Sequence, residues 1–139
     1  MKLLGLDWGS KRIGVALSTA SIGIALPLLT LSRTSWTNDV LAIKNIIQIH
    51  NISMIIIGLP ILLSGKLGQQ AFDTKNVVTK LQKEIEIPIK LIDERLTTVQ
   101  SYKILKETKT KSSKIHKKID EISACLILQS YIDSNHHEI

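Results

Sequence analysis

The sequence predicts an α/β fold: a mixed sheet of five strands, the first three antiparallel and the later ones parallel, with helices on both faces. Residues 3–6 are apolar, residues 12–18 alternate apolar with smaller side chains, and the glycine-containing turn between them indicates a hairpin. Farther along, apolar runs of strand length alternate with stretches of helical periodicity. The chain has 139 residues, 44% of them hydrophobic, so we expect residues 1–139 to form a single domain with one core.

The third strand and the first helix follow this hairpin. Residues 26–31 predict a strand, and Pro27 favours an edge position or the strand's start, because proline has no N–H to donate to a neighbouring strand. Residues 38–50 carry apolar side chains at helical spacing, with Thr37 or Asn38 as the expected helix cap.

The rest of the chain alternates between strand and helix. Residues 53–58 include a continuous apolar run, which is typical of a central strand covered on both faces. We expect a helix over residues 69–84, a strand over 87–92, a helix over 97–106 and a last helix over 119–134. The strands joined by such crossovers should be parallel, with right-handed connections.

Composition narrows the classes of function. A formal net charge of +6 favours a polyanionic partner such as nucleic acid. The single cysteine, Cys125, excludes an internal disulfide and a cysteine-based zinc site, and its apolar neighbours predict a buried, unreactive thiol. No stretch approaches the length of a membrane span, and Asp7 interrupts the N-terminal apolar run too early for a signal peptide. We therefore expect a cytoplasmic protein with no membrane partner.

Asp7 lies where the first predicted strand ends, directly before a turn that contains Lys11 and Arg12. One interpretation is a turn acid that accepts hydrogen bonds from backbone amides near Gly9. The other is a ligand site, because open α/β sheets bind their ligands at the carboxyl ends of their strands.

Asp93 and Glu94 occupy the same kind of position, directly after the predicted strand over residues 87–92. Acids there also suit the start of the next helix, with Thr97 as its cap. Because side chains alternate along a strand, Asp93 and Glu94 should point to opposite faces, and only one of them can readily face Asp7.

Asp120 is expected at the start of the last helix. An acid in a first helical turn is common, since the helix dipole favours it. This helix is apolar almost all round, however, so it should be buried, and its acid then needs a cation or hydrogen-bond donors.

Carboxylates at the ends of three elements, with no cysteine or histidine in the ligand set, suit Mg²⁺ or Mn²⁺. Two such ions about 3.5–4 Å apart can activate a water molecule and stabilise the leaving oxygen of a phosphodiester. The sequence therefore outlines a divalent-metal-dependent nuclease whose candidate ligands are Asp7, Asp120 and either Asp93 or Glu94.

Positive side chains accompany these acids. Lys11, Arg12 and Arg95 lie beside the first two acid positions and are the candidate substrate-binding residues. Residues 103–118 contain seven lysines and a single acid, Glu107. Such a run is either a solvated surface or, directly before Asp120, an arm that contacts phosphates.

Four ordered blocks carry a resemblance to a known family: residues 5–16 (GLDWGSKRIGVA), 57–60 (IGLP), 93–98 (DERLTT) and 119–131 (IDEISACLILQSY). The chain resembles the YqgF family of pre-16S ribosomal RNA nucleases, also described as Holliday-junction-resolvase-like proteins. The resemblance spans nearly the whole chain. It implies a ribonuclease H-like fold, a cytoplasmic location and trimming of the 5′ end of the small-subunit rRNA precursor.

The resemblance also implies site residues. Asp7, Glu94 and Asp120 match the family's acidic active-site positions, which favours Glu94 over Asp93, and Arg12 matches the arginine of the first motif.

This sequence departs from the family pattern in two places. Trp8 stands where other aromatic or aliphatic residues occur, and the loop near Ser64 lacks an acid often found there. The missing loop acid puts an accessory role for that loop in doubt.

Three rival functions share parts of this pattern. A Holliday junction resolvase would use the same chemistry on branched DNA and would favour a symmetric homodimer. Sugar-kinase and actin-like ATPases also place an Asp-x-Gly turn between two strands, but they need two such domains to close over a nucleotide. An inactive RNA-binding module would not need to retain all three acids.

Overall fold

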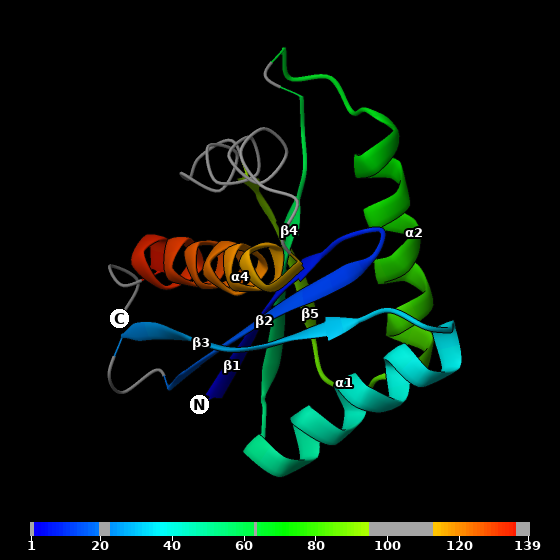
Figure 1. Cartoon of the computed structure of the whole chain (residues 1–139). Coiled ribbons are helices and arrows are strands. Elements are labelled where there is room, and N and C mark those ends of the chain that lie inside the picture. Colours follow the sequence, from blue (N-terminus) through cyan, green and yellow to red (C-terminus); the bar gives the residue numbers. More distant parts are fainter. Residues whose placement is uncertain (1, 20–22, 63, 95–112, 136–139) are drawn as a thin grey trace.

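The computed structural model describes residues 2–19, 23–62, 64–94 and 113–135. Along the chain the elements are β1 (Lys2–Trp8), β2 (Arg12–Thr19), β3 (Ile24–Ser32), α1 (Trp36–His50), β4 (Met54–Leu59), α2 (Gln69–Glu84), β5 (Ile89–Asp93) and α4 (Ser113–Asn135). Figure 1 shows α4 on one side of the sheet and α1 and α2 on the other. Among the described residues no helix combines the length and the hydropathy needed to cross a membrane.

The sheet has five strands in the order β3-β2-β1-β4-β5. β2 is antiparallel to both β1 and β3, whereas β4 is parallel to β1 and to β5. This confirms the predicted mixed sheet. β3 is an edge strand, as Pro27 indicated, and the register between β2 and β3 shifts between Val15 and Ala16.

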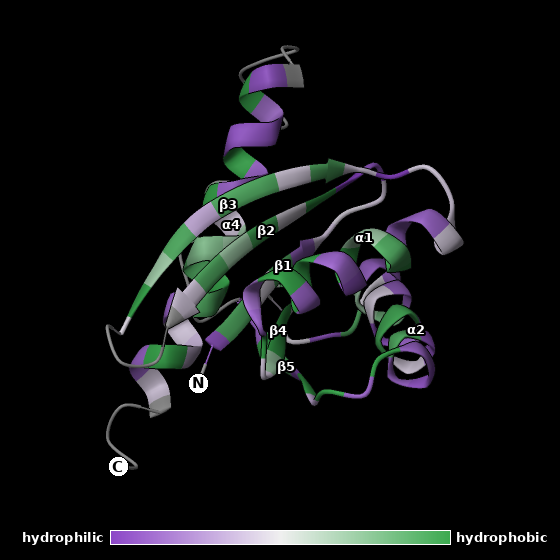
Figure 2. Cartoon of the chain, turned by 90° about the horizontal axis from the view of Figure 1, so that it is seen from below, coloured by the Kyte–Doolittle hydropathy of each residue, from purple (hydrophilic) through white to green (hydrophobic). Residues whose placement is uncertain are grey.

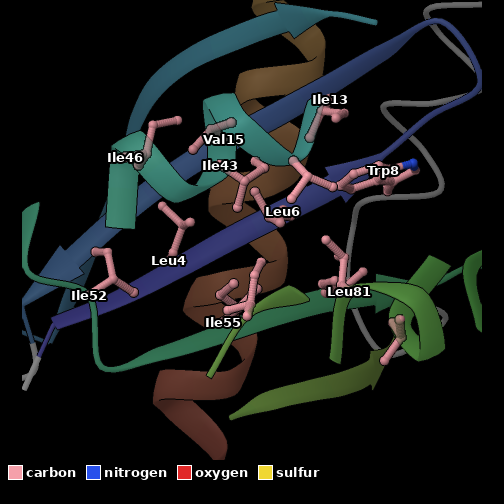
Figure 3. Close-up of a cluster of buried hydrophobic side chains, with 14 residues drawn as sticks. Leu4, Leu6, Trp8, Ile13, Val15, Ile43, Ile46, Ile52, Ile55 and Leu81 are labelled. Atoms are coloured by element: carbon pink, nitrogen blue, oxygen red, sulfur yellow. The ribbon is translucent and has the colours of Figure 1, made fainter. Parts of the chain in front are cut away.

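Two hydrophobic clusters lie on opposite faces of the sheet. In β1, Leu4 and Leu6 belong to the cluster with α1 and α2 (Figure 3). Leu3 belongs to the cluster with α4, because side chains alternate along a strand. β4 is buried on both faces in the same way, with Ile57 in the first cluster and Ile56 in the second. Helices therefore cover both faces of the sheet, as the sequence predicts.

The start of α1 corrects the predicted cap. The helix begins at Trp36, and Ser35 is its N-cap, with an extended backbone (φ −142°, ψ 159°). The Oγ of Ser35 accepts a hydrogen bond from the backbone N–H of Asn38 at 3.1 Å. Thr37 and Asn38, the expected caps, already lie inside the helix.

The second strand–helix–strand unit agrees closely with the prediction. α2 has the expected bounds, and β4 begins one residue late. β5 begins at Ile89 and not at Ile87, because Pro88 between them has no N–H for the ladder; its carbonyl accepts from the N–H of Ile55. The helix predicted over residues 97–106 lies outside the described residues.

The last helix starts earlier than the sequence predicts. α4 begins at Ser113, so Asp120 lies two turns inside the helix, and the prediction that it opens the helix is wrong. The first turns are rich in lysine, which has a high helix propensity, and their exposed side chains need no apolar face. Figure 2 shows these mostly hydrophilic turns projecting past the sheet.

Candidate functional site

Asp7 lies near the carboxyl end of the central strand β1 and is 4% exposed. Side chains alternate along β1, so Asp7 points to the same face as Leu3, the face that α4 covers. Both of its neighbours across the sheet are glycines. Gly14 of β2 pairs directly with Asp7. On the other side, Ile57 of β4 pairs with Leu6, so the next residue of β4, Gly58, lies beside Asp7.

Asp120 reaches this position because Gly14 has no side chain. A Cβ atom on Gly14 would overlap the backbone carbonyl of Asp120, so α4 approaches β2 more closely here than any other residue type would permit. Asp120 is 3% exposed. The helix thereby brings its acid beside the strand pair that carries Asp7.

Glu94 reaches the other side of Asp7 in the same manner. It directly follows β5, is 1% exposed, and its Oε1 would lie 2.6 Å from a Cβ atom on Gly58. Asp93 points to the opposite face, since its neighbour Ile92 packs in the cluster under α4. Of the two adjacent acids, Glu94 is the one on the face of Asp7.

The three acids named from the sequence are therefore gathered at the carboxyl edge of the sheet, around the central strand. As their side chains stand, no set of three His, Cys, Asp or Glu residues in the described part of the chain is close enough to hold a metal ion. An arginine explains part of this arrangement. Arg12 Nε donates to Asp120 Oδ2 at 2.7 Å, so one oxygen of this carboxylate already has a cation.

Arg12 was predicted to bind substrate, and its guanidinium lies against Asp120. Its side chain is 19% exposed, and its Nη2 lies 3.5 Å from Nδ1 of His116, one turn before Asp120 on α4. Lys11, in the same turn, is exposed. Arg95 lies outside the described residues.

A second arginine, which sequence reasoning missed, holds the turn after Asp7. Arg33 Nη1 donates to the carbonyl of Gly9 at 3.1 Å, and Arg33 Nε donates to Asp39 Oδ2 at 3.2 Å. Its guanidinium also lies over the ring of Trp8, 5.3 Å from the centroid. These contacts tie the turn to α1. No local motif marks Arg33, because its partners lie in two other segments, the end of β1 with its turn and the helix α1.

Lysines lie on the surface beside Asp120. Lys114, Lys117 and Lys118 of α4 are exposed and line a hollow along the first turns of the helix, together with Ile115, Ile119 and Glu121. Lys118 pairs with Glu121 at 3.8 Å. The other lysines of the basic run, Lys103, Lys106, Lys109 and Lys111, lie outside the described residues.

Cys125 is half-buried in α4, less enclosed than its apolar neighbours suggest. Burial, followed by the negative charge of Glu121, raises the pKa of the Cys125 thiol above its ordinary value. The thiol is therefore mostly protonated at neutral pH and a poor nucleophile.

Two solved structures share this fold over nearly their whole length. Thermus thermophilus RuvC bound to a Holliday junction substrate superposes with a TM-score of 0.58 and 11% identity over 98% of this chain and 96% of that one. The Holliday junction resolvase of fowlpox virus superposes with a TM-score of 0.53 and 15% identity over 96% of this chain and 99% of that one. The fold is thus that of the RuvC-like resolvases, within the ribonuclease H-like class.

Sequence comparison defines the family more closely. The family described as "RuvX: Holliday junction resolvase" matches residues 1–134, and the chain belongs to this family, for which YqgF is the other name. A protein of Thermoanaerobacter pseudethanolicus is 45% identical over 136 residues, 96% of this chain and 97% of its own length. One from Caldanaerobacter subterraneus subsp. tengcongensis is 41% identical over 135 residues, with the same coverage. Both carry the name "Putative pre-16S rRNA nuclease".

Proposed function

We propose that this chain is a divalent-metal-dependent nuclease that hydrolyses phosphodiester bonds near the 5′ end of the precursor of small-subunit rRNA. The observation that carries the proposal is the convergence of Asp7, Glu94 and Asp120, all nearly fully buried, at the carboxyl edge of the sheet. Buried carboxylates at one point are unfavourable without cations. The names of the relatives support the choice of RNA, and a cytoplasmic location follows from that substrate.

The residues fit a hard divalent cation. Asp7, Glu94 and Asp120 contribute only carboxylate oxygens, the donor type that Mg²⁺ and Mn²⁺ prefer. The two glycines beside Asp7 leave room for the other two acids. When bound, divalent ions would supply a water nucleophile at neutral pH and stabilise the charge that develops on the leaving oxygen.

The chain's own side chains have separate tasks in this proposal. Asp7, Glu94 and Asp120 would hold the divalent ion through their carboxylate oxygens. Arg12 neutralises Asp120 in the free protein, and with the divalent ion bound its guanidinium would be free to donate to a phosphate oxygen. Lys11 and the exposed lysines of α4 contact phosphates on either side of the cleaved bond, and we assign Arg95 to the same role.

Asp7→Asn tests the mechanism. The amide keeps the size of the side chain and removes its charge, so we expect Mg²⁺-dependent cleavage to fall by more than about 100-fold. Loss of a residue that only hydrogen-bonds to a metal ligand costs up to about 100-fold, and Asp7 is proposed as a ligand itself. Folding, followed by circular dichroism, should be unaffected. Asp73→Asn, an exposed acid on α2, is the matched control and should cleave normally. Unchanged cleavage by the Asp7 variant would refute the mechanism.

A Holliday junction resolvase is the second candidate, and the fold shared with RuvC favours it. Purified protein should be offered precursor rRNA and a four-way DNA junction, each with Mg²⁺ or with chelator. We expect cleavage of the RNA in Mg²⁺ only. Paired symmetric cuts in the junction with the RNA intact would favour the resolvase instead, which needs a homodimer to present two sites.

A further inference from the structure

Ser123 is a buried hydroxyl that has no hydrogen-bond partner among the described residues. It is 1% exposed. Other helical hydroxyls in this chain donate to a carbonyl of the preceding turn: Thr74 to Gln70, Thr79 to Lys75 and Ser134 to Tyr131, each at 3.0 Å. Ser123 does not. A buried polar group without a partner is costly, so its retention needs a reason.

The position of Ser123 supplies that reason. It lies three residues after Asp120 and four before Ile127, and residues at these spacings share one face of a helix. Ile127 packs against Gly58: a Cβ atom on this glycine would lie 2.5 Å from Cδ1 of Ile127. The Oε1 atom of Glu94 lies against the same glycine. Ser123 is therefore on the flank of α4 that faces Glu94, one turn from Asp120 and on the side toward the acids.

We propose that Ser123 belongs to the ligand site of the three acids, as a positioning residue whose hydroxyl hydrogen-bonds a water molecule of the hydrated divalent ion. Mg²⁺ keeps several of its waters when it binds to proteins, and these waters need partners around the carboxylates. A hydroxyl suits them because it both accepts and donates. Ser123 thus has no partner among the described residues of the free protein and gains one with the ion. This inference rests on the proposed function.

Ser123→Ala tests the proposal through stability as well as activity. The full chain, freed of metal, is melted in EDTA and at increasing Mg²⁺, and the Mg²⁺-dependent rise in melting temperature gives the affinity for the ion. In EDTA the variant should melt at or above the wild-type temperature, because it loses a hydroxyl that had no partner. The Kd for Mg²⁺ should rise about tenfold, as for other outer-shell partners of metal ligands.

Cleavage should show the same pattern. At low Mg²⁺ the variant should be slowed about tenfold, and high Mg²⁺ should restore it. Ser134→Ala, on the same helix but outside the acids, is the control and should respond to Mg²⁺ as the wild type does.

Two results would overturn the role of Ser123 alone. One is a lower melting temperature of Ser123→Ala in EDTA, which would mean that the hydroxyl is already bonded in the free protein. The other is a Kd for Mg²⁺ equal to that of the wild type. A wild-type protein that does not respond to Mg²⁺ would instead overturn the proposed function, and the role of Ser123 with it.

Discussion

Arg12 shows how the free protein tolerates acids that it buries. Asp120 is nearly inaccessible, and the guanidinium of Arg12, itself mostly covered, donates to it at 2.7 Å. A buried carboxylate with such a partner is stable, whereas one deprived of it is not. The sequence identified Arg12 as a cation near the site; that it bonds to Asp120, 108 residues away, is known only from the structure.

Arg12→Met should therefore destabilise the metal-free protein, by about 1–3 kcal/mol, because it leaves Asp120 buried without its cation. Mg²⁺ should stabilise this variant more than it stabilises the wild type, since the ion no longer competes with the guanidinium. Melting temperatures in EDTA and in Mg²⁺ measure both effects.

Lys11→Met removes an exposed charge from the same turn and is the control for Arg12→Met; it should change stability little. If Mg²⁺ raised the melting temperatures of the Arg12 variant and the wild type equally, Arg12 and the ion would not share Asp120.

At the scale of elements, α4 both packs on the sheet and carries exposed lysines, two features that the sequence analysis assigned to separate segments. Its central residues pack on the sheet and include Asp120 and Ser123. Its first turns, mostly hydrophilic in Figure 2, contain the exposed Lys114, Lys117 and Lys118. The sequence predicted a basic segment that ends where the helix begins. In the structure the lysines at residues 114–118 are helical, so they are held at fixed positions relative to Asp120.

Neutralising Lys114 and Lys117 together, as glutamine, should weaken binding to nucleic acid and lower the salt slope of log K by about 1.4–1.8, the value for two phosphate contacts. Binding titrations across a range of salt concentrations measure this slope.

The control for these lysines lies on the opposite face of the sheet. Lys75 and Lys83 of α2 are exposed, and replacing both with glutamine gives the same change in net charge. The two double variants should differ in slope. Equal slopes would assign the effect to net charge alone and leave α4 without a role in binding.

At the scale of the whole molecule, one sheet supports two cores. α1 and α2 pack on one face and α4 on the other, and every residue of β4 from Ile55 to Leu59 is buried. Because the same strands contribute side chains to both cores, unfolding of the sheet would expose both of them. We therefore predict that the chain unfolds as a single cooperative unit, in keeping with a single domain over residues 1–139.

Two probes on opposite faces test this prediction. The chain has two tryptophans, Trp8 and Trp36, and their ring centroids are 6.1 Å apart. Both pack in the first core, so their fluorescence reports its unfolding. Cys125 packs in the second core, and its thiol should react faster once unfolding exposes it and returns its raised pKa to the ordinary value. Urea midpoints from the two probes should coincide, and separated midpoints would indicate two units.

The sequence by itself determined the order and type of the described elements, the mixed sheet and the candidate acids. Strand-end position is a local property, so Asp7 and the pair Asp93 and Glu94 could be named before any contact was known, and the resemblance to the family favoured Glu94. Asp120 was named as the acid of a buried helix, although that helix begins earlier than predicted. The start of α4 was missed because exposed lysines leave no apolar pattern. What only the tertiary structure decided is how these acids meet. The close approach at Gly14 and Gly58 and the bond from Arg12 to Asp120 join segments far apart in the chain. These contacts, and the burial of the Ser123 hydroxyl without a partner among the described residues, depend on packing that no local pattern encodes.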